Sequence, residues 1–170
     1  MNIIFLDIDG VLNSQAYLES KRNNKGFYEL STFHLQKLAK LYHSCNALIV
    51  LTSTWRQLEK EDIYQYLIDS LAKYDMYIIS KTPIINMNRP LEIKTWLNNR
   101  IDKEQIHFII LDDDFSQEEY DKYDLGKYLI KTYFYCDTIE DGGLQQKQVD
   151  DAINLFKKQE RNDDNGSISL

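Results

Sequence analysis

The sequence is poor in cysteine and has no long apolar run. Its 170 residues include two cysteines, Cys45 and Cys136, which are far apart and lack a partner motif. We expect these to be buried thiols in a reduced compartment rather than a disulfide or a nucleophile. No apolar run approaches the ~20 residues of a membrane span. The chain opens on a strand-like segment with no secretory signal, so we expect a cytoplasmic protein without a membrane partner.

An excess of basic residues is also missing. The chain has 20 Lys and Arg residues against 27 Asp and Glu residues, for a net charge of -7. This balance argues against a broad nucleic-acid-binding surface, but it is compatible with a nucleotide end or a small phosphate ester as substrate. There is no internal repeat or low-complexity linker. The length suits one domain, which we place at residues 1–158, followed by a polar, disordered tail at residues 159–170.

Apolar segments and helical patterns alternate along the chain. Helices are predicted after Ser31, from about residue 60 to 73, after Pro90, and from about 144 to 158, and residues 14–30 are predicted to be a loop. The predicted strands are residues 2–6, 47–51, 76–79, 107–111 and 128–135. Strands separated by helices predict a parallel sheet with helices on both faces. The fold class is therefore α/β, a doubly wound three-layer sandwich.

Two carboxylates and a glycine follow the first predicted strand. Asp7, Asp9 and Gly10 come directly after an almost wholly apolar run. The glycine indicates that the backbone turns here, which puts both carboxylates at the carboxyl edge of the sheet, where open α/β folds bind ligands. Carboxylates so close repel each other unless a cation lies between them, and Mg²⁺ prefers oxygen ligands. Seen alone, the segment also fits an ordinary Asp-Gly turn.

Other predicted strands also end in polar side chains. The second ends in Thr52 and Ser53, whose hydroxyl and backbone donors at a strand-to-helix junction could hold phosphate oxygens. The fourth is followed by three acidic residues, Asp112 to Asp114. In a parallel sheet these strand ends lie at the edge that carries Asp7, so we expect the functional site at that edge.

The segment from Asp7 to Leu12, Asp-Ile-Asp-Gly-Val-Leu, resembles the first motif of the haloacid dehalogenase (HAD) superfamily of phosphotransferases. Thr52 aligns with the second motif of that superfamily, and Asp112-Asp113 resembles the acidic fourth motif. Arg89 stands where the third motif usually has a lysine. Further details resemble the HAD domain named from Swiss Army Knife RNA repair proteins, and these are Leu51–Arg56, Arg89–Leu97, Ile110–Asp114 and Gly143-Leu144.

The resemblance implies a Rossmann-like core and a hydrolase, a phosphatase that works through an aspartyl-phosphate. Asp7 would be the nucleophile and Asp9 the acid and base. The metal-binding site would hold Mg²⁺ with Asp7, the Asp9 backbone carbonyl and Asp113, with Asp112 beside it. Thr52 and Arg89 would hold the phosphate oxygens. The second Asp favours a phosphatase over a dehalogenase.

The sequence leaves some assignments open. The basic role belongs to Arg89, or else to Lys94 or Lys81, and either Asp112 or Asp113 is the direct metal ligand. Further substrate-binding candidates are Gly10, Ser53, Arg56 and Lys94. Trp55 and Arg56 line the pocket, or else are a core side chain and a surface side chain.

The spacing of the motifs leaves no room for a large cap domain. An open, capless site suits a macromolecular substrate, either a phosphoprotein or a nucleic-acid end. The alternatives are a small-metabolite phosphatase and a non-catalytic binding module that keeps the fold.

Overall fold

The computed structural model describes residues 1–21 and 29–166, with side chains described up to residue 163. Five parallel strands form one sheet in the order β3-β2-β1-β4-β5. The strands are β1 (Asn2–Leu6), β2 (Ala47–Leu51), β3 (Ile78–Lys81), β4 (His107–Asp112) and β5 (Leu129–Lys131). The predicted α/β class is confirmed, and the described residues include no large cap.

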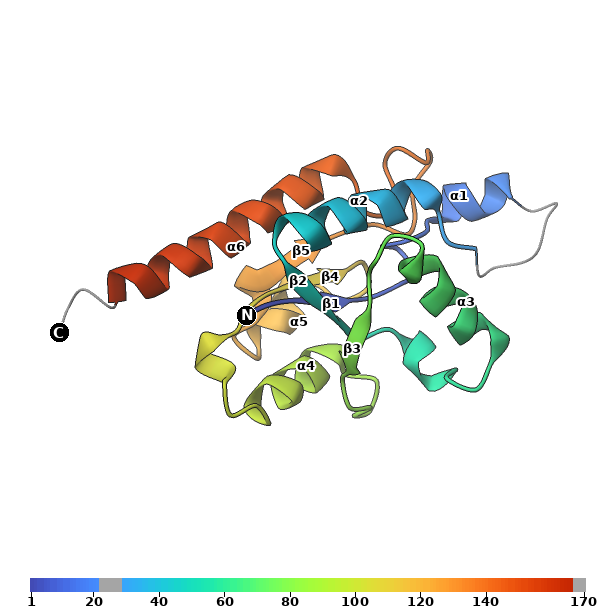
Figure 1. The fold of residues 1–170 in the computed structure, drawn as a ribbon. Coiled ribbons are helices and arrows are strands. Elements are labelled where there is room, and N and C mark those ends of the chain that lie inside the picture. Colours follow the sequence, from blue (N-terminus) through green and yellow to red (C-terminus); the bar gives the residue numbers. More distant parts are fainter. Residues whose placement is uncertain (22–28, 167–170) are drawn as a thin grey trace.

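Helices cover both faces of this sheet (Figure 1). The α-helices are α1 (Gln15–Ser20), α2 (Thr32–Ser44), α3 (Asp62–Ala72), α4 (Arg89–Asn98), α5 (Gln117–Asp121) and α6 (Gln146–Gly166). Three short 3-10 helices lie between them, η1 (Thr54–Gln57), η2 (Lys103–Gln105) and η3 (Gly126–Tyr128). In the described part of the chain, no helix combines the length and the apolar character that crossing a bilayer requires.

The alternation of side chains along β1 divides the core in two. Ile4 and Leu6 pack with apolar residues of α2, α3 and α6 on one face of the sheet. Ile3 and Phe5 pack on the other face with residues of α4 and α5. Successive strand residues point to opposite faces, so Asp7, which follows Leu6, continues the series that faces α4. This periodicity decides which helix meets the candidate site.

The region predicted as a loop contains a helix, α1. Ser14 caps it, since its side chain accepts a hydrogen bond from the Tyr17 backbone N–H. A one-and-a-half-turn helix has too few residues to show a periodic apolar pattern. Residues 22–28 of the same predicted loop lie outside the described residues.

Two strands differ from prediction. β3 begins at Ile78 and ends at Lys81, about two residues later than expected. β5 is only Leu129–Lys131, because the chain leaves the sheet after Thr132, whose N–H still bonds to Asp112. Tyr133 and Tyr135 then project into solvent, so their strand-like pattern did not reflect burial.

The last helix is longer than predicted. α6 runs to Gly166 and so includes much of the segment expected to be a disordered tail. Gln159 explains part of this, since its side-chain amide bonds to both the backbone N–H and the C=O of Phe108 on β4. His107 Nε2 also lies 2.7 Å from a carboxylate oxygen of Asp163. Both cysteines are free thiols, as expected, but they are half-buried and not buried as predicted.

Candidate active site

The ends of β1, β2 and β4 meet at one point of the sheet edge. Leu6 is in register with Leu51 on one side and with Leu111 on the other. The ladder continues one step further, with Asp7 N donating to Leu111 O at 3.0 Å and Thr52 N donating to Leu6 O at 2.9 Å. Asp7, Thr52 and Asp112 therefore lie side by side, as the parallel-sheet argument predicted.

Three carboxylates converge at this point. Each of Asp7, Asp112 and Asp113 offers an oxygen, and these atoms lie within 4.8 Å of one another. Burial raises the pKa of Asp7 to about 6, with Arg89 opposing the shift and Asp112 adding to it. Burial and the charges of Asp7 and Asp112 raise the pKa of Asp113 to about 7. The cluster concentrates negative charge that a cation would neutralise.

Arg89 supplies the basic group of the site. It opens α4, where Asn88 caps the helix by accepting a hydrogen bond from Leu91 N, and Pro90 occupies the first turn. The Arg89 Nη1 atom lies 2.5 Å from Asp7 Oδ2 and 2.7 Å from Asp112 Oδ2. Burial lowers the pKa of Arg89, but the two carboxylates outweigh burial and the net shift is upward. Arg89 thus stays charged while almost fully buried.

Asp112 and Asp113 have different surroundings. Asp112 is fully buried, and its Oδ1 accepts hydrogen bonds from the N–H groups of Asp114 (2.7 Å) and Phe115 (3.2 Å). Its Oδ2 accepts from the Tyr120 hydroxyl at 2.5 Å in addition to facing Arg89. Asp113 is half-buried. This arrangement makes Asp112 an anchor of the loop and leaves Asp113 as the better candidate for a direct metal ligand.

Gly10 allows Asp113 to approach. Its φ of +69° lies in the left-handed region, which favours glycine. A Cβ atom at this position would overlap the carboxyl group of Asp113. Glycine is therefore needed both for the turn after Asp9 and for the contact with the acidic loop.

The Asp9 side chain is not part of the cluster of three carboxylates. Its Oδ1 accepts a hydrogen bond from Asn13 Nδ2, and its Oδ2 accepts one from Trp55 Nε1, both at 2.8 Å. Of the two alternatives for Trp55, the structure has the core position, since the side chain is buried in the larger core cluster. Its indole N–H still reaches the site.

The hydroxyl groups at the end of β2 lie beside Asp7. Thr52 is fully buried, and its Oγ1 has no hydrogen-bond partner among the described residues. Ser53 caps η1 by accepting a hydrogen bond from Trp55 N. A buried hydroxyl without a partner is uncommon, which makes Thr52 Oγ1 a candidate contact for a ligand.

Arg56, a substrate-binding candidate, is neither at the surface nor available. It is buried, and its Nη1 donates to the backbone oxygens of Thr52 and Ser53. Its Nη2 lies 2.6 Å from Glu92 Oε2. Arg56 therefore links the end of β2 to Glu92 on α4 and has a structural role next to the site.

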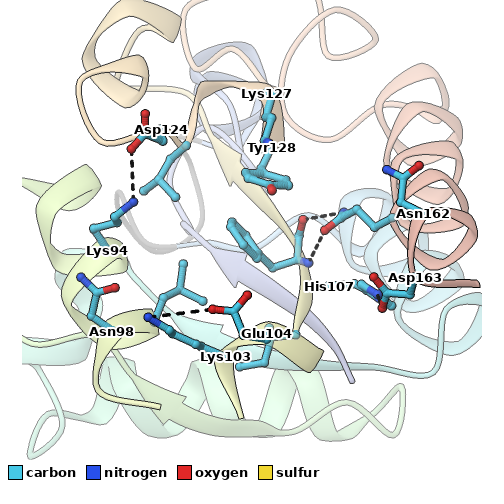
Figure 2. Close-up of a pocket in the computed structure, with 15 residues that line it drawn as sticks. Lys94, Asn98, Lys103, Glu104, His107, Asp124, Lys127, Tyr128, Asn162 and Asp163 are labelled. Atoms are coloured by element: carbon cyan, nitrogen blue, oxygen red, sulfur yellow. Dashed lines mark hydrogen bonds and ion pairs between the residues drawn. The ribbon is translucent and has the colours of Figure 1, made fainter. Parts of the chain in front are cut away.

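The two lysine alternatives to Arg89 also have other partners. Lys94 Nζ donates to Tyr123 O at 2.9 Å and lies 3.5 Å from Asp124. It lines a cavity of about 450 Å³ together with His107, the first residue of β4, so it is turned toward the opposite edge of the sheet (Figure 2). Lys81 pairs with Glu59 at 2.8 Å. Among the three candidates, only Arg89 contacts the carboxylates.

Sequence reasoning missed Tyr120 and Lys131, which support the acidic loop. Tyr120 is fully buried on Asp112, and the Ser116–Glu119 capping box that opens its helix was a readable signal. Lys131 Nζ donates to the backbone oxygens of Asp113 (2.5 Å) and Phe115 (2.9 Å). It reaches them because Lys131 on β5 is in register with Asp112 on β4, a pairing that the sequence does not show.

Comparison with known proteins agrees with this geometry. No curated protein and no solved structure matches the chain. One protein family does match, over residues 3–148, a range that includes the five described strands except Asn2 of β1 and all the site residues named above. The chain therefore belongs to the family described as the HAD domain in Swiss Army Knife RNA repair proteins.

Proposed function

We propose that this protein is a Mg²⁺-dependent phosphatase that hydrolyses a phosphomonoester through a phosphorylated Asp7. Membership of the HAD family supports hydrolase chemistry of this general kind. The observation that carries the proposal is the contact of one buried arginine, Arg89, with the Asp7 and Asp112 carboxylates beside Asp113. Opposite charges packed at a strand end form a site for a phosphate and its counter-ion.

The donor set fits magnesium. The candidate ligands Asp7, Asp112 and Asp113 offer carboxylate oxygens within 4.8 Å of one another, and none of the three is a His or Cys. Mg²⁺ prefers such oxygen ligands, whereas zinc sites in proteins usually include nitrogen or sulfur. Asp7 and Asp113, with the Asp9 backbone carbonyl, would hold the ion, while Asp112 anchors the loop. The bound ion would neutralise charge on the phosphate oxygens.

Asp7 and Asp9 divide the covalent chemistry. A carboxylate oxygen of Asp7 attacks phosphorus and forms the Asp7 O–P bond, while the ester O–P bond breaks and Asp9 gives a proton to the leaving oxygen. Asp9 then removes a proton from water. That water attacks the phosphorus, the Asp7 O–P bond breaks, and phosphate leaves. The two steps replace one difficult displacement.

Neighbouring groups hold the phosphate during both steps. Arg89 already lies 2.5 Å from Asp7 and can share its guanidinium with phosphate oxygens, which its planar shape suits. The unpartnered Thr52 hydroxyl and Ser53 offer further donors at the end of β2. Gly10 keeps the backbone close enough for Asp113 to take part.

We infer a macromolecular substrate, with an RNA end favoured over a phosphoprotein. The family is named from RNA repair proteins, and no large cap covers the site among the described residues. Loops at the same sheet edge also expose large apolar side chains, Ile84 and Met87 after β3, and Tyr133 and Tyr135 after β5. Exposed aromatic rings at a site favour stacking with unpaired bases.

The test is hydrolysis of a generic aryl phosphate, with and without Mg²⁺, by wild-type protein and by Asp7→Asn. We expect Mg²⁺-dependent release of phosphate by the wild type alone. Oligoribonucleotides with 5′- or 3′-phosphates, phosphopeptides and small phosphate esters then rank the substrates by kcat/KM. Binding of a phosphorylated oligonucleotide without turnover of any substrate would instead identify a binding module.

A further inference from the structure

We propose that Trp55 and Asn13 are positioning residues that hold the Asp9 carboxylate in line for proton transfer to the leaving oxygen. This inference rests on the proposed function. It starts from a contact that the motifs do not predict, because Trp55 follows β2 whereas Asp9 and Asn13 follow β1. Each residue donates to a different oxygen of Asp9, at 2.8 Å in both cases.

The two donors are themselves fixed. Trp55 and Asn13 are 2 % and 0 % exposed, respectively. The Asn13 amide cannot turn over, because its Oδ1 accepts a hydrogen bond from Gly10 N at 3.0 Å. Trp55 lies in η1, where its N–H bonds to the capping Ser53 hydroxyl and its C=O accepts from Leu58 N. A carboxylate bound at both oxygens by buried groups cannot rotate freely.

The chemistry of the donors suits this role. An indole N–H and an amide NH₂ donate hydrogen bonds and cannot accept a proton at those atoms. Each carboxylate oxygen has two acceptor positions, and each uses one here, so Asp9 keeps a free position for the proton it transfers. Trp55 and Asn13 therefore restrict where Asp9 points without competing for its proton. Such orientation lowers the barrier to proton transfer.

Positioning of Asp9 can be distinguished experimentally from a purely structural role of Trp55 and Asn13. A good leaving group such as dinitrophenolate departs without protonation, whereas an alkoxide needs a proton from Asp9. Loss of Asp9 positioning should thus slow the hydrolysis of alkyl phosphates and have little effect on dinitrophenyl phosphate. A general loss of folding or of phosphate binding would slow both substrates equally. The quantity to compare is kcat/KM, which reports the step in which the leaving group departs.

The experiment measures kcat/KM for 2,4-dinitrophenyl phosphate and for an alkyl phosphate in wild type, Trp55→Phe and Trp96→Phe. Phenylalanine keeps most of the ring packing and removes the N–H. Trp96 is the matched control, because it is similarly buried but donates to Ser80 Oγ at 3.0 Å on the other face of the sheet. We expect Trp55→Phe to lower kcat/KM by a factor that is at least tenfold larger for the alkyl ester than for the dinitrophenyl ester. Trp96→Phe should change kcat/KM for the two esters by the same factor.

Equal losses on the two esters, or no loss on either, would overturn the proposal. Asn13→Ala should show the same selective loss, and it decides the question if Trp55→Phe has no cooperative thermal unfolding transition. Asp9→Asn sets the maximum selective loss. The proposed function fails separately, and is rejected if wild-type protein turns over neither ester. If wild type is active and Asp7→Asn is not, the function stands whatever Trp55→Phe does.

Discussion

Arg89 Nη1 lies 2.5 Å from Oδ2 of Asp7. This contact joins the first residue of α4 to the residue that follows β1, and it occurs where both side chains are almost fully buried. An arginine here is a departure from the usual lysine of the superfamily. The same Nη1 atom also lies 2.7 Å from Asp112 Oδ2, so one guanidinium balances two carboxylates. The departure is thus compatible with the same electrostatic role.

Removing Arg89 should cost most of the activity. If it neutralises the bound phosphate, Arg89→Ala should lose on the order of 2–4 kcal/mol of transition-state stabilisation. At 1.36 kcal/mol per decade, kcat/KM falls roughly 30- to 1000-fold. Lys94→Ala should fall less than about threefold on the same scale, because Lys94 bonds to Tyr123 and Asp124. Both variants are assayed on one substrate at saturating Mg²⁺.

The Arg89→Ala and Lys94→Ala variants can also contradict the assignment of Arg89 as the basic residue of the site. A large loss at Lys94 with little at Arg89 would exchange their roles. Little loss at either would move attention to Lys131, whose Nζ contacts the backbone of Asp113. Arg89→Lys keeps the charge but not the fork, and it should recover part of the activity lost by the alanine variant.

Asp7→Asn should abolish turnover and leave the fold intact. The amide is a poor nucleophile, so the covalent step fails. The substitution also removes one negative charge next to Asp112 and Asp113, which offsets the loss of the Arg89 contact. Activity assays with circular dichroism and thermal unfolding check both halves of this prediction. Near wild-type turnover by a well-folded variant would remove Asp7 from the nucleophile role.

Metal dependence should distinguish Asp113 from Asp112. Chelation should abolish activity, and Mg²⁺ should restore it, whereas Zn²⁺ alone should not. Asp113→Asn should raise the Mg²⁺ concentration needed for half-maximal activity more than Asp112→Asn does, because it removes an oxygen that would bind the ion directly. Asp112→Asn should mainly lower the melting temperature, because Asp112 accepts hydrogen bonds from Tyr120 and two backbone N–H groups.

Titration of Mg²⁺ into each variant by calorimetry separates binding from catalysis. Full activity of the wild type in excess chelator would count against a metal site. A larger loss of Mg²⁺ affinity in Asp112→Asn than in Asp113→Asn would exchange the roles of direct ligand and anchor.

Much of the site was predictable because a parallel sheet converts sequence order into position. Apolar strands that end in Asp7, Thr52 and Asp112 must bring those residues to one edge. The position of Arg89 followed from the family resemblance, and its contact with Asp7 agrees with that assignment. These inferences needed only strand boundaries and one resemblance.

The contacts that the sequence did not predict depend on the tertiary structure. The bonds from Trp55 to Asp9 and from Lys131 to Asp113 join segments at the ends of neighbouring strands, and they require the register and the path of each loop. Burial of a charged residue is also invisible in a sequence. The sequence alone suggests that Arg56 is a surface or pocket residue. The structure shows that it pairs with Glu92, which lies on a helix far along the chain.

That buried pair gives the last prediction, which concerns stability. The side chains of Arg56 and Glu92 are 4 % and 2 % exposed, and their charged atoms lie 2.6 Å apart. Breaking a buried pair leaves an uncompensated charge, so Arg56→Ala should lower the free energy of unfolding by about 3–5 kcal/mol. The matched control is Lys81→Ala, which breaks the more exposed pair with Glu59 and should cost less than about 1 kcal/mol. Urea denaturation measures both. If Arg56 binds substrate instead, its alanine variant would raise KM with little change in unfolding free energy, and its assignment as a support of β2 would be wrong.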